Sequence, residues 1–139
     1  MKDIKAKKIH LGQYIMNKKN LYYSFEQINK DIRKLYLTLK GYKGIVKNIY
    51  GTEGLGLIFA VIISSMTGIP LLREKTKISS KTIVIFDKIE SVKDFLKFLK
   101  GKRYFSTVAI WLSEESKYKP TIYLNIKSKQ YRIKYLWEK

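Results

Sequence analysis

The sequence contains no cysteine and a single histidine, His10. The chain therefore cannot form disulfides or thiolate metal sites, and one histidine cannot build a histidine metal site. The longest apolar run, Leu55 to Met66, contains two serines and is shorter than the roughly 18 residues that a membrane span needs. The lysine-rich start is not followed by the apolar stretch of a signal peptide. We expect a cytoplasmic protein with no membrane partner.

Acidic residues are also scarce. Asp and Glu number 11 against 29 Lys and Arg, so the net charge is +18. One interpretation is a nucleic-acid partner, because basic side chains release counterions from a phosphate backbone. The other is compositional, since a Lys-, Ile- and Tyr-rich chain is typical of an AT-rich genome or a hot environment. The lysines are scattered rather than gathered in one block, and both interpretations stay open.

The length of 139 residues suits one compact domain. Residues 1–20 hold six lysines and one acid, and we interpret them as a basic N-terminal extension. Residues 21–139 are then a single domain in which helical and extended patterns alternate. The expected helices cover 25–40, 52–67 and 92–100, and the expected strands cover 42–51, 69–75, 81–87 and 104–112, followed by a C-terminal β-hairpin that turns at 127–129.

Local signals support the helix boundaries. Ser24 and Gln27 have the spacing of a capping box, and Ser91 can cap the helix that follows it. Gly41 and Gly68 supply helix stops. Strands that alternate with helices of this length predict an α/β fold, with a mainly parallel sheet and helices on both faces. In such sheets, ligands bind beyond the carboxyl ends of the strands.

Four segments then resemble one known family. "YYSFEQINKDIRKL" is similar to an opening "Y-S-W-E-E" helix, and "GIVKNIYGTEGLGLIFAVIISSMTGIPLL" to a strand, glycine loop and helix that end in "G-I-P". "TIVIFDKI" lies where a hydrophobic strand ends in paired acids, and "KPTIYLNI" with "YLWEK" resembles the "P-D-Y-Y" and "F-P-W-E" segments. Together they resemble the type I phosphoribosyltransferases, especially the short xanthine-guanine purine enzymes, from residue 21 to the C-terminus.

The resemblance implies a glycosyltransferase reaction of purine salvage. These enzymes join a nucleobase to the ribose of phosphoribosyl pyrophosphate and release pyrophosphate, with Mg²⁺ as cofactor. It also implies that Asp87 is the catalytic and metal-binding acid. We further expect a homo-oligomer, such as a dimer.

The resemblance also assigns the remaining site residues. The phosphate-binding candidates are Gly54, Gly56, Lys75, Lys88 and Ser91, and the base-binding candidates are Tyr123, Trp137 and Glu138. Each has a structural alternative: the two glycines can serve only close packing of helix on sheet, and strand aromatics are more often core than ligand platforms.

One segment departs from the family pattern. Lys88 stands where the second acid belongs, and the loop after it lacks the Thr-Gly donors for a ribose phosphate. Two functions therefore stay open: a purine phosphoribosyltransferase with a divergent phosphate loop, or a non-catalytic relative that binds a nucleotide or nucleic acid. A small structural or interaction domain is the third alternative.

Overall fold

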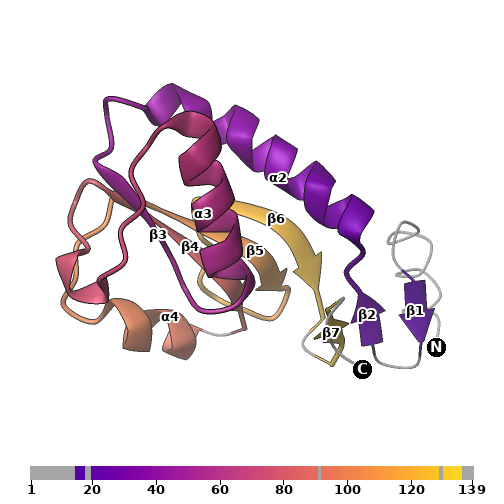
Figure 1. The fold of residues 1–139 in the computed structure, drawn as a ribbon. Helices are drawn as coiled ribbons and strands as arrows, with labels where there is room; N and C mark the ends of the chain where they lie inside the picture. Colours follow the sequence, from indigo (N-terminus) through magenta and orange to yellow (C-terminus); the bar gives the residue numbers. More distant parts are fainter. Residues whose placement is uncertain (1–14, 18–19, 91, 129, 136–139) are drawn as a thin grey trace.

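The computed structural model describes residues 15–17, 20–90, 92–128 and 130–135, which form two sheets (Figure 1). The larger sheet has the order β3-β4-β5-β6, and all its strands are parallel. Its strands are β3 (Asn48–Gly51), β4 (Thr82–Ile89), β5 (Ser106–Ser113) and β6 (Ile122–Lys127). All eight residues of β5 are buried, as expected of a central strand covered on both faces.

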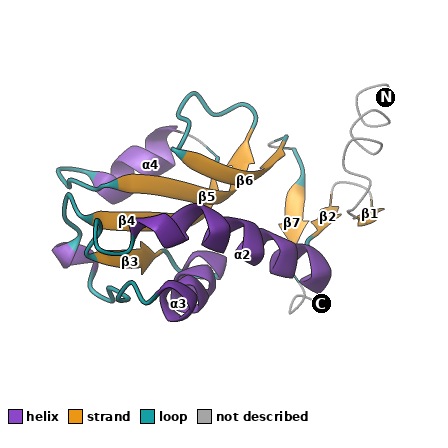
Figure 2. Ribbon diagram, turned by 90° about the horizontal axis from the view of Figure 1, so that it is seen from above, coloured by secondary structure: helices purple, strands orange, loops and turns teal. Residues whose placement is uncertain are grey.

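The helices lie on both faces of this sheet, as predicted (Figure 2). Helices α2 (Phe25–Leu39) and α3 (Leu55–Thr67) share one apolar cluster with one face, and α4 (Val92–Leu99) shares a second cluster with the other face. The Ser24 cap is confirmed at α2, where the Gln27 N–H donates to Ser24 Oγ over 3.1 Å, while the Gln27 side-chain amide donates to Asp31 Oδ1 over 3.1 Å. Gly68 ends α3 in the left-handed conformation.

The smaller sheet joins the two ends of the described chain. Strand β1 (Ile15–Asn17) pairs antiparallel with β2 (Asn20–Tyr22), and β2 pairs parallel with β7 (Arg132–Lys134). The buried Asp31 carboxylate attaches this sheet to the core, because it accepts hydrogen bonds from the Tyr23 hydroxyl and from Asn125 of β6. Segments from both ends of the sequence therefore lie beside one end of the larger sheet.

Two strand predictions were wrong. The expected C-terminal hairpin does not form, because β6 and β7 belong to different sheets. The alternation of apolar and polar residues predicts that β6 and β7 are extended, but it does not show that β7 pairs with β2. Residues 69–75 form only an isolated bridge, between Ile49 and Leu71, followed by a short 3₁₀ helix at Lys75–Lys77. Within the part of the chain that the structure describes, no helix combines the length and apolar character needed to cross a membrane.

The contact between β3 and α3 leaves no room for a side chain at Gly51. A Cβ there would lie 2.2 Å from the Gly56 carbonyl oxygen and 2.7 Å from the Ala60 Cβ. The register pairs Gly51 with Ile85, so β4 continues past the end of β3 and presents Asp87 to the loop that follows. This close contact brings that loop to the end of β4.

We predict that Gly51→Ala lowers the free energy of unfolding by about 1–3 kcal/mol, because its methyl group forces the helix away from the strand. Gly41→Ala is the matched control, since nothing lies within 4 Å of a Cβ at that position. Chemical denaturation of both variants is the measurement. Equal stability of the two variants would show that the close contact does not constrain the fold.

Candidate functional site

The loop between β3 and α3 meets the end of β4 through backbone hydrogen bonds. The Thr52 N–H donates to the Ile85 carbonyl oxygen over 3.0 Å, and the Asp87 N–H donates to Thr52 Oγ1 over 3.2 Å. A Cβ at Gly56 would lie 2.6 Å from Thr52 Oγ1 and 2.8 Å from the Ile85 carbonyl oxygen. Gly56 therefore has a packing role whether or not a ligand binds.

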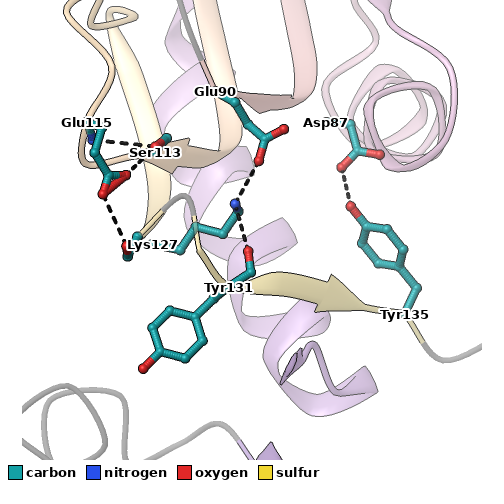
Figure 3. Close-up of polar contacts among 8 residues, drawn as sticks. Asp87, Glu90, Ser113, Glu115, Lys127, Tyr131 and Tyr135 are labelled. Carbon is teal, nitrogen blue, oxygen red and sulfur yellow. Dashed lines mark hydrogen bonds and ion pairs between the residues drawn. The ribbon is translucent and has the colours of Figure 1, made fainter. Parts of the chain in front are cut away.

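The carboxylate of Asp87 lies at the N-terminus of α3. Its Oδ2 accepts from the Leu55 N–H over 3.4 Å. Its Oδ1 accepts from the Tyr135 hydroxyl over 2.6 Å, a bond that Figure 3 shows. The helix dipole favours a negative group at this end. Gly54 has a φ of 80°, and a Cβ there would lie 2.8 Å from Asp87 Oδ2. Asp87 thus takes the position at this helix end that a bound anion would take.

Burial and hydrogen bonding act in opposite directions on Asp87. Burial raises the pKa of the carboxyl above its ordinary value of 3.8, while the bonds from Tyr135 and Leu55 and the nearby charge of Lys88 lower it. Burial is the largest cause, so the pKa of Asp87 is raised overall. The charged form is therefore less favourable here than in water.

A second polar group lies at the same edge of the sheet. Lys127, at the end of β6, has a side chain only 1% exposed, and its Nζ is 2.9 Å from Glu90 Oε2 and 3.0 Å from the Tyr131 carbonyl oxygen (Figure 3). A buried cation needs such a partner. The pairing also neutralises Glu90, so this acid repels a phosphate at the start of α4 less than its sequence position suggests.

Further hydrogen bonds hold the chain after β6 against this edge. Glu115 accepts from Ser113 Oγ at 2.8 Å and from Ser128 Oγ at 3.1 Å. Together with Lys127 and Tyr135, these bonds tie residues 128 and 130–135 to the carboxyl ends of β4 and β5 (Figure 3). The edge where ligands bind in parallel sheets is therefore bordered by the C-terminal segment.

The junction from β4 to α4 is short. Strand β4 runs to Ile89 and α4 begins at Val92, which leaves residues 90–91 between them. Lys88 lies in the strand, is exposed and pairs in register with Trp111 of β5. The segment where the family resemblance places a ribose-phosphate loop is thus mostly strand and helix.

The structure brings only part of the predicted site together. Gly54, Gly56 and Asp87 converge, whereas the Lys75 ammonium lies over the Phe98 ring of α4, 4.4 Å from its centroid. Tyr123 is 44% exposed and pairs in register with Ala109, whose side chain packs in the α4 cluster. It therefore lies on the α4 side of β6. Ser91, Trp137 and Glu138 lie outside the described residues.

Several residues of this edge were missed by sequence reasoning. Thr52, Glu90, Lys127 and Tyr135 are positioned by contacts between residues up to 48 positions apart. A lysine or tyrosine carries no signal of its own in a chain with 29 basic residues and 11 tyrosines. Only the position of Tyr135 at the start of "YLWEK", within the resembling tail, could have indicated it.

The residues at this edge fit a magnesium site that is shared with a phosphate ligand, rather than one made of protein side chains alone. Among the described residues, no group of three or more His, Cys, Asp or Glu side chains could hold a metal ion. Mg²⁺ commonly binds one or two carboxylates together with phosphate oxygens of a substrate. Asp87 offers one such carboxylate at the sheet edge.

Comparison with known proteins defines the fold. No family model and no curated protein matches this chain. Among solved structures, a purine phosphoribosyltransferase from Pyrococcus horikoshii is similar with a TM-score of 0.68 and 21% identity, covering 87% of this chain and 95% of that one. A xanthine-guanine-hypoxanthine phosphoribosyltransferase from Helicobacter pylori gives 0.59 and 15%, covering 86% and 93%.

A third solved structure has the same fold. It is a hypothetical protein from Neisseria gonorrhoeae with bound ppGpp, and it gives a TM-score of 0.58 at 15% identity, covering 90% of this chain and 92% of that one. The predicted fold is therefore confirmed: this chain has the α/β fold of the type I phosphoribosyltransferases. Identities of this size show the fold alone.

We predict that Asp87 makes the protein less stable as the pH rises. A folded pKa above 3.8 means that its stabilising contribution is complete below that pH and is lost as the pH rises through the folded pKa. Asp87→Asn removes this titration, so its free energy of unfolding should fall less than that of the wild type above about pH 4.

Denaturant unfolding over a pH series measures this difference. Glu26→Gln is the control, because the Glu26 side chain is 82% exposed and lies in α2, away from the sheet edge. A pH dependence of Asp87→Asn identical to that of the wild type would contradict the raised pKa.

Proposed function

We propose that this chain is a purine-type phosphoribosyltransferase that binds phosphoribosyl pyrophosphate at the carboxyl edge of its larger sheet. The observation that carries the proposal is the Asp87 carboxylate on the Leu55 N–H, at the junction of the glycine loop and β4. A negative group already occupies this helix end, so the position suits an anion. The fold and its similarity to two purine phosphoribosyltransferases support the same reaction class.

The proposed roles follow from the positions of the residues. Once Asp87 turns away from Leu55, the N–H groups at the start of α3 can face the pyrophosphate, and Gly54 lets the backbone approach it. Asp87 would then hold the Mg²⁺ shared with the diphosphate, which supplies positive charge against the phosphate oxygens. In the reaction, the bond from C1′ of the ribose to the pyrophosphate oxygen breaks, a bond from C1′ to a purine nitrogen forms, and the proton of that nitrogen is lost to the solvent or to the released pyrophosphate.

The other candidate site residues are proposed to bind the ribose phosphate and the base. Lys88 and Ser91 are proposed for the ribose phosphate at the start of α4, where the pairing of Glu90 with Lys127 removes a repulsive charge. For the base we propose Trp137 and Glu138 rather than Tyr123. They follow Tyr135, which contacts Asp87, whereas Tyr123 lies on the α4 side of β6.

The contacts of Asp87 oppose the binding of phosphoribosyl pyrophosphate. The ligand has to replace an internal hydrogen bond at α3, and only residues 90–91 lie between β4 and α4, which is a short connection for surrounding a second phosphate. We therefore expect weak affinity for phosphoribosyl pyrophosphate and slow transfer.

A non-catalytic nucleotide-binding relative is the second candidate. Two features favour it: Lys88 stands where the family pattern has its second acid, and β4 continues to Ile89 through the segment where that pattern has the ribose-phosphate loop. A nucleotide also occurs on this fold, because the Neisseria gonorrhoeae neighbour has bound ppGpp. Nucleic acid is less favoured, because exposed basic side chains occur both on α2 and on α4, which cover opposite faces of the sheet.

We predict that Mg²⁺ with phosphoribosyl pyrophosphate raises the melting temperature, and that pyrophosphate is released with guanine, xanthine or hypoxanthine. Asp87→Asn should lower kcat/KM by about 100-fold, or about 2.7 kcal/mol, through loss of its charge. Glu26→Gln is the control and should keep the wild-type rate. The absence of pyrophosphate release with all three bases would exclude the transferase.

For the second candidate, the expected result is a melting temperature that rises with purine monophosphates while no base releases pyrophosphate. A parallel titration with a short oligonucleotide at low and high salt tests the nucleic-acid partner, whose affinity should fall steeply with salt. If neither nucleotide nor oligonucleotide stabilises the protein, this candidate is excluded as well.

A further inference from the structure

Helix α4 exposes an apolar side chain among lysines. Phe95 and Leu99 pack in the core cluster that α4 shares with the sheet, whereas Leu96 is 57% exposed. Residues three and four positions apart are neighbours on a helix surface, so Leu96 lies beside Lys93, and Lys100 follows four positions later. Both lysines are exposed. The outer surface of α4 therefore combines apolar and cationic groups.

A hollow of about 910 Å³ lies between α4 and the turn that follows it. Its apolar lining is formed by Phe95, Leu96, Leu99 and Tyr104. The turn leads into β5, which begins at Ser106, so this part of the hollow lies at the amino edge of the sheet, opposite the candidate site. Figure 1 shows α4 at the lower edge of the molecule, with no described helix or strand beyond it.

The charged residues that line this hollow all carry the same sign. They are Lys93, Lys97, Lys100 and Lys102. Over residues 91–113 the sequence has five basic residues and a single acid, Asp94. None of the four lysines forms an ion pair with an acidic side chain that the structure describes. Their charges are therefore available to an anionic partner.

We propose that the hollow beside α4 is a docking site for an acidic amphipathic segment of another protein. The apolar side chains of that segment pack on Leu96 and Tyr104, and its carboxylates lie among the four lysines. Removal of Leu96 from water contributes to the affinity, while the opposite charges select the partner and speed association. This inference does not rest on the proposed function.

Charge and apolar character together favour this occupant over the alternatives. Another copy of this chain carries +18, and residues 1–14 hold four lysines against one acid, so the lysines of the hollow repel both. A nucleic acid attracts the lysines, but its bases stack on aromatic rings, and the exposed apolar residue here is the aliphatic Leu96. An anionic bilayer offers both chemistries, but it is a broad surface, whereas the site is a hollow.

Two pairs of variants test the apolar and the charged part of the site. Leu96→Gln removes the exposed apolar group, and Leu37→Gln is its matched control, because Leu37 is 56% exposed on α2 at the opposite face of the sheet. Lys97→Glu reverses one charge of the hollow, and Lys34→Glu makes the same change at an exposed position of α2. Lys100→Glu is a second charge variant in case Lys97→Glu does not fold, and circular dichroism checks the fold of each.

The probe is a labelled synthetic helix of about 14 residues, long enough to span α4, with leucines on one face and glutamates on the other. One reference peptide has the same composition in scrambled order, and a second has lysines in place of the glutamates. Fluorescence anisotropy with the full chain measures the binding of each.

The wild type should bind the probe with a Kd below about 100 μM, and each reference peptide at least about tenfold more weakly. Leu96→Gln and Lys97→Glu should raise the Kd of the probe at least about fivefold, while Leu37→Gln and Lys34→Glu should change it less than about twofold. Salt should weaken the binding, because it screens the attraction between the opposite charges.

Three results would overturn the proposal. The first is no binding of the probe at about 500 μM protein, or equal binding of the probe and the scrambled peptide, which would show that charge alone attracts them. The second is binding that the variants of the hollow and those of α2 weaken equally.

The third is tighter binding of a short oligonucleotide, or of vesicles of anionic phospholipid, that Lys97→Glu weakens. This result would assign the lysines of the hollow to a nucleic acid or to a membrane surface. The substituted residues lie outside the candidate site, and pyrophosphate release is a separate measurement, so failure here leaves the proposed function untouched.

Discussion

The close approach of α3 to the ends of β3 and β4 is the constraint on which the candidate site depends. Gly51 and Gly56 have no side chains to keep the helix away, so its first N–H groups reach the end of β4. The Asp87 carboxylate then accepts a hydrogen bond from Leu55, and Tyr135 binds its other oxygen. One carboxylate thereby joins the glycine loop, the central sheet and the C-terminal segment.

The contacts of Asp87 give a second explanation for the segment after β4, which departs from the phosphate motif of the family. In the sequence, Asp87 matches the first acid of the motif, but the Thr-Gly donors that should follow it are missing. This pattern suggests a ligand site that has lost part of its function. The structure shows that the acid caps a helix and that Glu90, which would repel a phosphate, is paired with the buried Lys127. The edge of the sheet is thus a satisfied polar surface in the free protein, and any anionic ligand has to exchange with internal groups rather than enter an open cradle.

The net charge of +18 is not confined to one face of the sheet. Exposed lysines and arginines occur on helices that cover both faces of the sheet. Helix α3 itself contains no charged residue, and Leu57, Ile58, Val61 and Met66 are exposed on it.

Sequence by itself determined the local elements and the order in which they occur. The Ser24 cap, the stop at Gly68 and the apolar strands depend on neighbouring residues, so periodicity and capping chemistry predicted them and, through their alternation, the parallel sheet. Tertiary structure decided which distant segments meet. The pairing of β7 with β2 rather than β6, and the contacts of Asp87 with Tyr135 and of Glu90 with Lys127, arise only when the chain closes loops of many residues, and no local pattern encodes such pairs.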